Sequence, residues 1–534
     1  MNLRLRNLGA SVVLLGVYGI ATLPILKSFP PVWPDEVNLY GPAAALARGQ
    51  GMGTAVLAGF LPGIEHHTYW QPPGYFFFLS LLLRLVPVAH HFVAMRVFSW
   101  LLGAAVLLLG AAILKRLTRR WTWALLGLVL LATEVGFMQA ANVGRMEMLS
   151  LACTVAALDA YLAFRQKRLR SVLAFAGFLA GLALLCHPAG IAAASVMVVH
   201  ELVSPPDRSP ASEPGESPGP RWKSRFHFRE RLEDATVFAG AAALPFIPWL
   251  VYILHAPSFF FAQMAAQSNR KSLLLGTLLE RHGIAHWLMS PFQNAACPLG
   301  APWLGLWPLP VGSAELIPLA ILGVGLAGLL AVGRRRVEAS LLGAWVLAGY
   351  AINLFMPEFW YTVCFLTPCC ILLGWTFAEA SRRGLRAAAL VVLLMAGAWN
   401  FAEAKLMWWY CRDGWQAYQL YCLTLTRLIP PRSTVLLAVI PDPYFGLLER
   451  DKSYRMLEFV PLGVPVEQAQ AEAVLDHVDY VVGSDCCRPR YLSDYLRLHG
   501  KVVASLGEWD FLSPPVVLWK LRDPAKISQA SSGP

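Results

Sequence analysis

The segment PVWPDEVNLYGPAAALARGQGMGTAVLAGFLPGIEHHTYWQPP, residues 31–73, is the part of the chain that organises the fold. It holds two adjacent carboxylates, Asp35 and Glu36, in a polar loop directly after a hydrophobic stretch. Placing a pair of acids at the edge of a bilayer costs free energy, so such a pair usually serves a function. Pro34 and the residues after it predict a short helix lying flat on the membrane surface, with both carboxylates at its positive end. The alternative is that the acids only cap the backbone amides of that helix.

The composition of the 534-residue chain is that of a polytopic membrane protein. Apolar residues make up 57% of it and charged residues 14%, whereas soluble chains carry about 25% charged residues. The excess of 44 Lys and Arg over 33 Asp and Glu does not indicate nucleic acid, because the arginines fall in short runs between hydrophobic stretches. This is the positive-inside pattern. The ten cysteines contain no CxxC pair, so they predict neither a disulfide framework nor a zinc motif.

At about 20 apolar residues per crossing, the sequence predicts about eleven transmembrane helices. They are expected near residues 8–27, 93–114, 121–140, 147–164, 171–187, 189–203, 235–254, 314–333, 339–356, 360–380 and 387–404. The N-terminal stretch lacks a small-residue cleavage site, which favours a retained span that starts in the cytoplasm. The short apolar stretch from Tyr75 to Val86 carries Arg84 and is expected to be an interfacial helix.

With the N-terminus inside, the basic runs all fall on the cytoplasmic side, together with the Pro- and Ser-rich linker 204–233. The outer side receives the first loop, residues 28–92, and a long loop at 255–312. Residues 1–405 are therefore predicted to form the transmembrane domain. Residues 406–534 are predicted to form a small α/β domain in the periplasm. Its expected strands are the β-branched runs at 433–440, 479–483, 501–506 and 515–521.

Several residues on the predicted outer face could carry chemistry. Glu147 lies at the mouth of the fourth span, where a carboxylate requires a cation or a hydroxyl donor, unless it only complements a helix N-terminus. Arg96 and Arg145 suit a phosphate because a guanidinium is permanently charged and bidentate. Arg145 and Glu147 are two residues apart and are not expected to pair with each other. His187 is either a polar residue at a helix end or a further phosphate contact.

The run HHTYWQPPGY, residues 66–75, places histidines and aromatic residues next to the membrane. A belt of aromatic residues at the membrane interface explains Tyr69 and its aromatic neighbours without any function. His66 and His67 are candidate ligands for a divalent metal ion, although two adjacent histidines do not easily bind one ion in good geometry.

The order of these motifs resembles the GT-C superfamily of membrane glycosyltransferases. The similarity is to the bacterial branch related to protein O-mannosyltransferases and to the lipid A aminoarabinose transferase. It covers roughly the first 200 residues and extends more weakly to the end of the chain. The motifs that carry it are Asp35-Glu36, Gln71-Pro72-Pro73-Gly74-Tyr75, Arg96 at the start of the second span, Arg145-Met146-Glu147 and His187-Pro188.

The resemblance implies an enzyme of the inner membrane that moves a sugar from a polyprenyl-phosphate donor to a lipid, glycan or protein acceptor at the periplasmic face. Asp35 would be the catalytic base on the acceptor, with Glu36 and Glu147 as further acids. The positive residues would stabilise the departing phosphate. The implied substrate-binding residues are Arg96, Arg145, His187, Tyr69 and Gln71.

Two positions depart from the pattern of these relatives. The aminoarabinose transferases place an acidic metal ligand where this chain has Trp70, which leaves the use of a metal open. An Arg-Tyr pair at the start of a late span is replaced by Glu358-Phe359-Trp360-Tyr361. The alternatives are a lipid or glycan transporter or flippase, which predicts charges in mid-span and inverted halves, and a noncatalytic assembly protein with the same fold.

Overall fold

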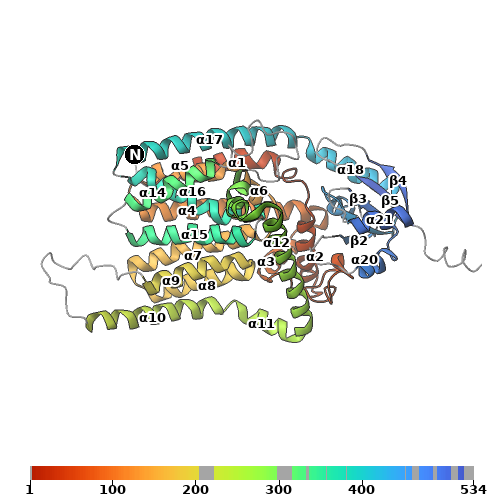
Figure 1. Ribbon diagram of the computed structural model, residues 1–534, viewed down its shortest axis with the longest axis horizontal. Helices are drawn as coiled ribbons and strands as arrows, with labels where there is room; N and C mark the ends of the chain where they lie inside the picture. Colours follow the sequence, from red (N-terminus) through yellow and green to blue (C-terminus); the bar gives the residue numbers. More distant parts are fainter. Residues whose placement is uncertain are drawn as a thin grey trace, which may run out of the picture.

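The computed structural model describes residues 3–203, 222–296, 316–331, 336–356, 358–380, 382–450, 453–459, 468–484, 490–506 and 515–521. A bundle of long helices forms one end of the molecule and a small sheet the other (Figure 1). The expected linker 204–233 and loop 255–312 lie partly outside the described residues. The linker prediction is wrong for residues 222–233, which form the first turns of the helix Trp222–Ala243. This part of the chain has no proline, and its arginine and glutamate residues are good helix formers.

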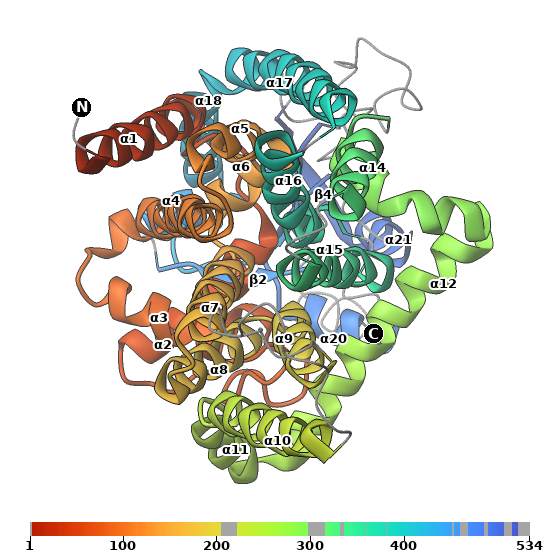
Figure 2. The same cartoon turned by 90° about the vertical axis from the view of Figure 1, so that its left-hand side faces the viewer.

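Most helices of the bundle run nearly parallel to its long axis, with α17 and α10 on opposite sides (Figures 1 and 2). Its helices are α1 (Leu3–Thr22), α4 (His91–Leu117), α5 (Trp121–Ala132), α6 (Val135–Asn142), α7 (Glu147–Lys167), α8 (Arg170–Cys186), α9 (Ile191–Val203), α10 (Trp222–Ala243), α11 (Phe246–His255), α14 (Leu316–Ala331), α15 (Arg336–Phe355), α16 (Thr362–Glu379) and α17 (Arg383–Cys411). Between bundle and sheet lie α2 (Pro34–Ala47), α3 (Gly74–Leu83) and α12 (Pro257–Ala296) (Figure 1).

Several helices have the length and composition of membrane spans. Within the described residues, five stretches are long and apolar enough to cross a membrane, and seven if each bent helix pair counts as one span. Five further apolar helices are shorter, among them α3. The chain is thus a multi-pass helical protein, and the count of eleven spans remains a prediction.

Two spans that were expected to be continuous are bent. The span predicted at 121–140 turns by 68° between α5 and α6, and the span predicted at 235–254 turns by 47° between α10 and α11. At the first bend, Glu134 accepts hydrogen bonds from the amides of Gly136 and Phe137 at 3.0 and 2.6 Å. The acid therefore caps α6 and starts a new helix direction.

The segment that begins at residue 255 is not a loop in its described part, contrary to expectation. Residues 257–296 form α12, which is interrupted at Gly283, where φ is 76°. Charged residues lower the hydropathy of this segment, but Gln263, Gln267 and Lys271 recur at helical spacing and so lie on one face. Hydropathy alone missed this helix.

Within the described part of the chain, the sheet has five strands in the order β2-β1-β3-β5-β4. β1 pairs in parallel with β2 and β3, and β5 pairs antiparallel with β3 and β4. The four segments expected as strands correspond to β1 (Thr434–Ala438), β3 (Tyr480–Gly483), β4 (Gly500–Ser505) and β5 (Val517–Leu521), with β4 starting one residue before its expected segment. β2 (Arg455–Glu458) was not expected. The accompanying helices are α18 (Gly414–Leu428), α19 (Tyr444–Leu448), α20 (Gln468–Leu475) and α21 (Arg490–His499).

One face of the sheet packs against residues 31–73 of the first loop. Val435 and Val482 of the sheet share a buried cluster with Tyr40 of α2. The amide of Asp442 also donates a hydrogen bond to the carbonyl of Val32 at 2.9 Å. The sheet therefore holds the start of α2 in place, and the division into domains at residue 405 stays a prediction.

Candidate active site

A small cavity opens where α2, α12 and the loop between α6 and α7 meet. Its volume is about 20 Å³, room for about one water molecule. Charged and polar side chains predominate in its lining, and Asp35 is among them. The lining residues are Asp35, Leu39, Trp70, Gln71, Arg145, Met146, Gln267, Arg270, Lys271, Glu358 and Tyr361.

The two adjacent acids of the first loop have different partners. Glu36 accepts a hydrogen bond from the amide of Trp33 at 3.2 Å and so caps the start of α2. Its side chain is completely buried. The Asp35 carboxylate instead faces Arg145 and is 19% exposed. The capping explanation therefore applies to Glu36, and Asp35 is the acid that reaches the cavity.

Arg145 joins two carboxylates of the site. Its guanidinium contacts Asp35 through Nη1 and donates to Glu147 through Nη2 at 2.6 Å. The expectation that Arg145 and Glu147 do not pair is wrong, because α7 begins only at Glu147 and Arg145 lies in the loop before it. The guanidinium also lies over the ring of Trp360, with its central carbon 4.2 Å from the ring centroid.

Arg96 lies behind the site and does not line the cavity. It donates to Glu36 through Nε at 3.0 Å and through Nη2 at 2.7 Å, and both side chains are fully buried. It also donates to the carbonyls of Leu26 and Pro30, at 3.1 and 2.8 Å. This geometry indicates that Arg96 holds the loop around Asp35 rather than contacting a lipid phosphate. Glu36, its partner, has a structural role and not a chemical one.

α12 brings two cations that the sequence analysis did not single out. Lys271 donates to Glu358 at 2.6 Å and Arg270 does so at 3.4 Å. Burial lowers the pKa of Lys271, and the nearby Glu358 carboxylate opposes that shift. The signal in the sequence was the adjacent pair Arg270-Lys271 on the predicted outer side, where the positive-inside rule disfavours basic residues.

One glutamine fixes α12 against the first loop. Gln263 is completely buried and bonds four backbone groups of that loop. Its Oε1 accepts from the amides of Tyr69 and Trp70 at 2.7 and 3.2 Å. Its Nε2 donates to the carbonyls of Pro62 and His67, both at 2.9 Å. Lys271 lies two helical turns further along α12, so this contact sets its position relative to Trp70.

The remaining predicted residues divide between the cavity and its surroundings. Gln71 lines the cavity. Tyr69 is buried and donates its hydroxyl to the carbonyl of Tyr252 at 3.0 Å, outside the cavity lining. His187 packs on Tyr361, with ring centroids 5.1 Å apart. His187 is buried and does not line the cavity.

His66 and His67 do not form a metal site in this geometry. His66 is exposed, and Nδ1 of His67 lies 3.2 Å from the hydroxyl of Tyr252. Nowhere in the described ranges do three or more His, Cys, Asp or Glu side chains come together as a group able to hold a metal ion. His66 and His67 therefore do not fit a divalent metal ion.

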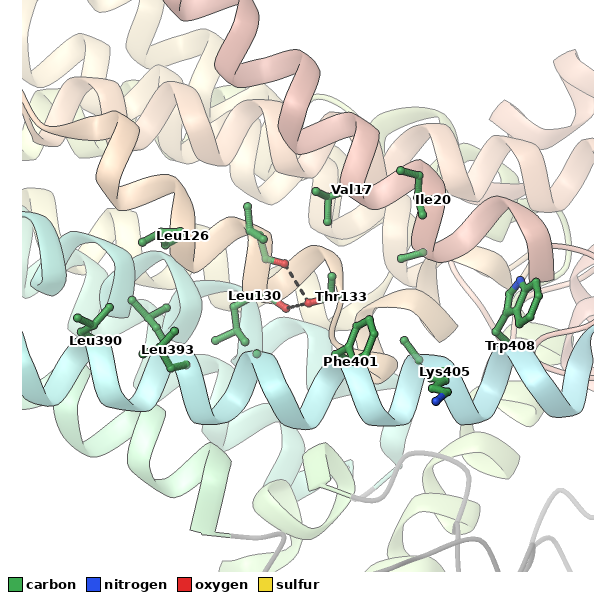
Figure 3. Close-up of a pocket in the computed structure, with 15 residues that line it drawn as sticks. Val17, Ile20, Leu126, Leu130, Thr133, Leu390, Leu393, Phe401, Lys405 and Trp408 are labelled. Carbon is green, nitrogen blue, oxygen red and sulfur yellow. Dashed lines mark hydrogen bonds between the residues drawn. The ribbon is translucent and has the colours of Figure 1, made fainter.

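A second, larger cavity lies on the outer surface of the bundle. This groove between α1, α5 and α17 has a volume of about 610 Å³ (Figure 3). Its walls are mostly apolar, and the hydroxyl of Thr133 is already bonded to the carbonyls of Val129 and Leu130. Lys405 and Trp408 lie at one end of it (Figure 3). The groove suits a hydrocarbon chain, but its lining carries no carboxylate that could act as a base.

Comparisons with known proteins support the resemblance seen in the motifs. Residues 70–214 match the family described as dolichyl-phosphate-mannose-protein mannosyltransferase. No curated protein gives a significant match to the sequence.

Solved structures match the chain over nearly its whole length. ArnT from Cupriavidus metallidurans, bound to undecaprenyl phosphate, aligns with a TM-score of 0.56 at 15% identity, covering 96% of this chain and 97% of that chain. The Archaeoglobus fulgidus oligosaccharyltransferase tethered with an acceptor peptide aligns with a TM-score of 0.50 at 12% identity, covering 96% and 75%. The chain therefore shares its fold with these two proteins, and together with the family match this confirms the resemblance to the GT-C superfamily of membrane glycosyltransferases.

Proposed function

We propose that this protein is a glycosyltransferase that moves a sugar from a polyprenyl-phosphate donor to an acceptor at the outer face of the inner membrane. One observation carries the proposal: a partly exposed carboxylate, Asp35, shares a cavity with the cations Arg145, Arg270 and Lys271. ArnT bound to undecaprenyl phosphate and the oligosaccharyltransferase with its acceptor peptide have the same fold. Their ligands support a lipid-linked donor, and the second supports a protein acceptor.

The residues of the cavity match the needs of such a transfer. The bond between the sugar carbon and the phosphate oxygen breaks, and a bond to the acceptor forms. Asp35 takes the proton that the acceptor loses. The negative charge left on the phosphate requires cations in a water-poor site, which Lys271 and Arg270 provide. Arg145 holds Asp35 in place while Glu147 balances its charge.

The orientation in the membrane is part of the proposal. With eleven spans and a cytoplasmic N-terminus, the cavity and the sheet face the periplasm. We assign residues 1–405 to the membrane domain and residues 406–534 to the periplasmic domain. A cavity of about 20 Å³ is too small for a sugar, so α12 or the turn at Glu358 has to move when the donor binds.

Mass analysis of cell-envelope lipids, glycans and proteins tests this function. Cells that lack the protein should lose one sugar modification, and cells with the wild-type chain should regain it. Cells with Asp35→Asn should not regain it although the variant is present in the membrane. Asp413→Asn is a matched control, because this carboxylate is 73% exposed and does not line the cavity. Identical envelopes with and without the protein would contradict the proposal and favour a transport or assembly role.

A further inference from the structure

Glu358 pairs with Lys271 and Arg270, the two cations to which a lipid phosphate would bind. Its two carboxylate oxygens accept from Lys271 at 2.6 Å and from Arg270 at 3.4 Å. The three side chains are only 17–20% exposed. Glu358 lies on a tight turn between α15 and the 3-10 helix Phe359–Tyr361, where its amide donates to the carbonyl of Met356 at 2.7 Å. The contact therefore ties this turn to α12 across the cavity.

The charges that line or adjoin the cavity are balanced in this arrangement. Three cations, Arg145, Arg270 and Lys271, face three carboxylates, Asp35, Glu147 and Glu358. Arg145 already contacts two of these carboxylates, whereas Lys271 and Arg270 share only Glu358. A phosphate that enters the cavity competes with the fewest carboxylates at Lys271 and Arg270 of α12. To bind there it has to displace Glu358.

The charge of the phosphate changes during the proposed reaction. A sugar linked through a phosphodiester leaves one negative charge on the donor. The released polyprenyl phosphate is a monoester with a charge of about −1.5 to −2 at pH 7. Cations without a competing carboxylate would therefore bind the product more tightly than the donor, and product release would be slow.

We propose that Glu358 competes with the lipid phosphate for Lys271 and Arg270. The carboxylate leaves these cations when the donor binds and returns to them as the spent polyprenyl phosphate departs. Glu358 thus weakens phosphate binding and promotes release of the product. This inference rests on the proposed function, since it assumes a polyprenyl-phosphate substrate.

Binding of undecaprenyl phosphate to the purified full-length protein in detergent tests the inference. Glu358→Gln keeps the shape and one acceptor oxygen but removes the charge, and we expect it to bind the lipid roughly three- to tenfold more tightly than the wild type. Glu358→Asp shortens the side chain and should shift affinity in the same direction. Lys271→Met should weaken binding, and Asp413→Asn should leave it unchanged because that carboxylate lies outside the cavity.

The outcomes separate this inference from the proposed function. Unchanged or weaker binding by Glu358→Gln and Glu358→Asp, with normal binding by the wild type, would show that Glu358 only holds the turn and would overturn the inference alone. A wild-type protein that does not bind undecaprenyl phosphate would overturn the proposed function as well. The apparent unfolding temperature of each variant establishes that binding is measured on folded protein.

Discussion

Replacing Arg96 by Met should destabilise the protein more than it affects phosphate binding. The change leaves the Glu36 carboxylate buried without its cation and removes the donors to the carbonyls of Leu26 and Pro30. Breaking a fully buried ion pair by removing one partner costs about 3–5 kcal/mol. Because single domains are stable by only about 5–15 kcal/mol, this loss is large enough to measure.

The assay is thermal unfolding of the purified protein in detergent, compared with binding of undecaprenyl phosphate well below the unfolding temperature. Arg96→Met should lower the apparent unfolding temperature by several degrees and leave binding intact at low temperature. The double variant Glu36→Gln/Arg96→Met should lose less than the two single variants together, because the neutral amide no longer requires a cation. Normal thermal stability of Arg96→Met combined with lost binding would refute this reasoning and return Arg96 to the phosphate.

Three further predictions follow from other contacts. Gln263→Ala leaves four backbone groups of the first loop without a partner, so the unfolding temperature and the affinity for undecaprenyl phosphate should both fall, at a cost of roughly 1–3 kcal/mol; unchanged values would show that the loop is held otherwise. Burial raises the pKa of Asp442 from 3.8 to about 7, and burial beside Asp442 also raises that of Glu458. The folded protein then binds these protons more tightly than the unfolded chain, so stability should decline as the pH rises from 3.8 to about 7. Asp442→Asn should flatten this part of a plot of unfolding temperature against pH, and an unchanged slope would contradict the assignment. A reporter enzyme fused after Pro534 should be active only outside the cytoplasm, and cytoplasmic activity would require a different number of spans.

Much of the architecture follows from patterns that the sequence displays locally. Apolar runs predicted most helices of the bundle, and β-branched runs predicted four of the five strands in the described residues. The bend between α5 and α6 was missed because hydropathy averaged over Glu134 hides a helix cap. α12 was missed because its charged residues resemble a loop until their helical spacing is considered.

Part of the candidate site was also predictable from local patterns in the sequence. Asp35, Arg145 and Glu147 lie next to apolar spans in the sequence, and the structure brings both carboxylates into contact with Arg145. The division of roles between Asp35 and Glu36 was not predictable, since it depends on Arg96, which lies 60 residues away in the sequence. The contribution of Lys271 likewise depends on the packing of α12 against the first loop, which no local pattern encodes.

The turnover of Asp35→Asn, measured on purified protein with the sugar donor identified by the envelope analysis, tests the central claim most directly. Arg145 keeps its contact with Glu147 in this variant, so the fold and lipid binding should be retained. Loss of a general base lowers the rate by about 10²–10⁴-fold, and we expect a loss in this range with undecaprenyl phosphate binding close to that of the wild type. An Asp35→Asn protein that transfers sugar at the wild-type rate would contradict the assignment of Asp35 as the base.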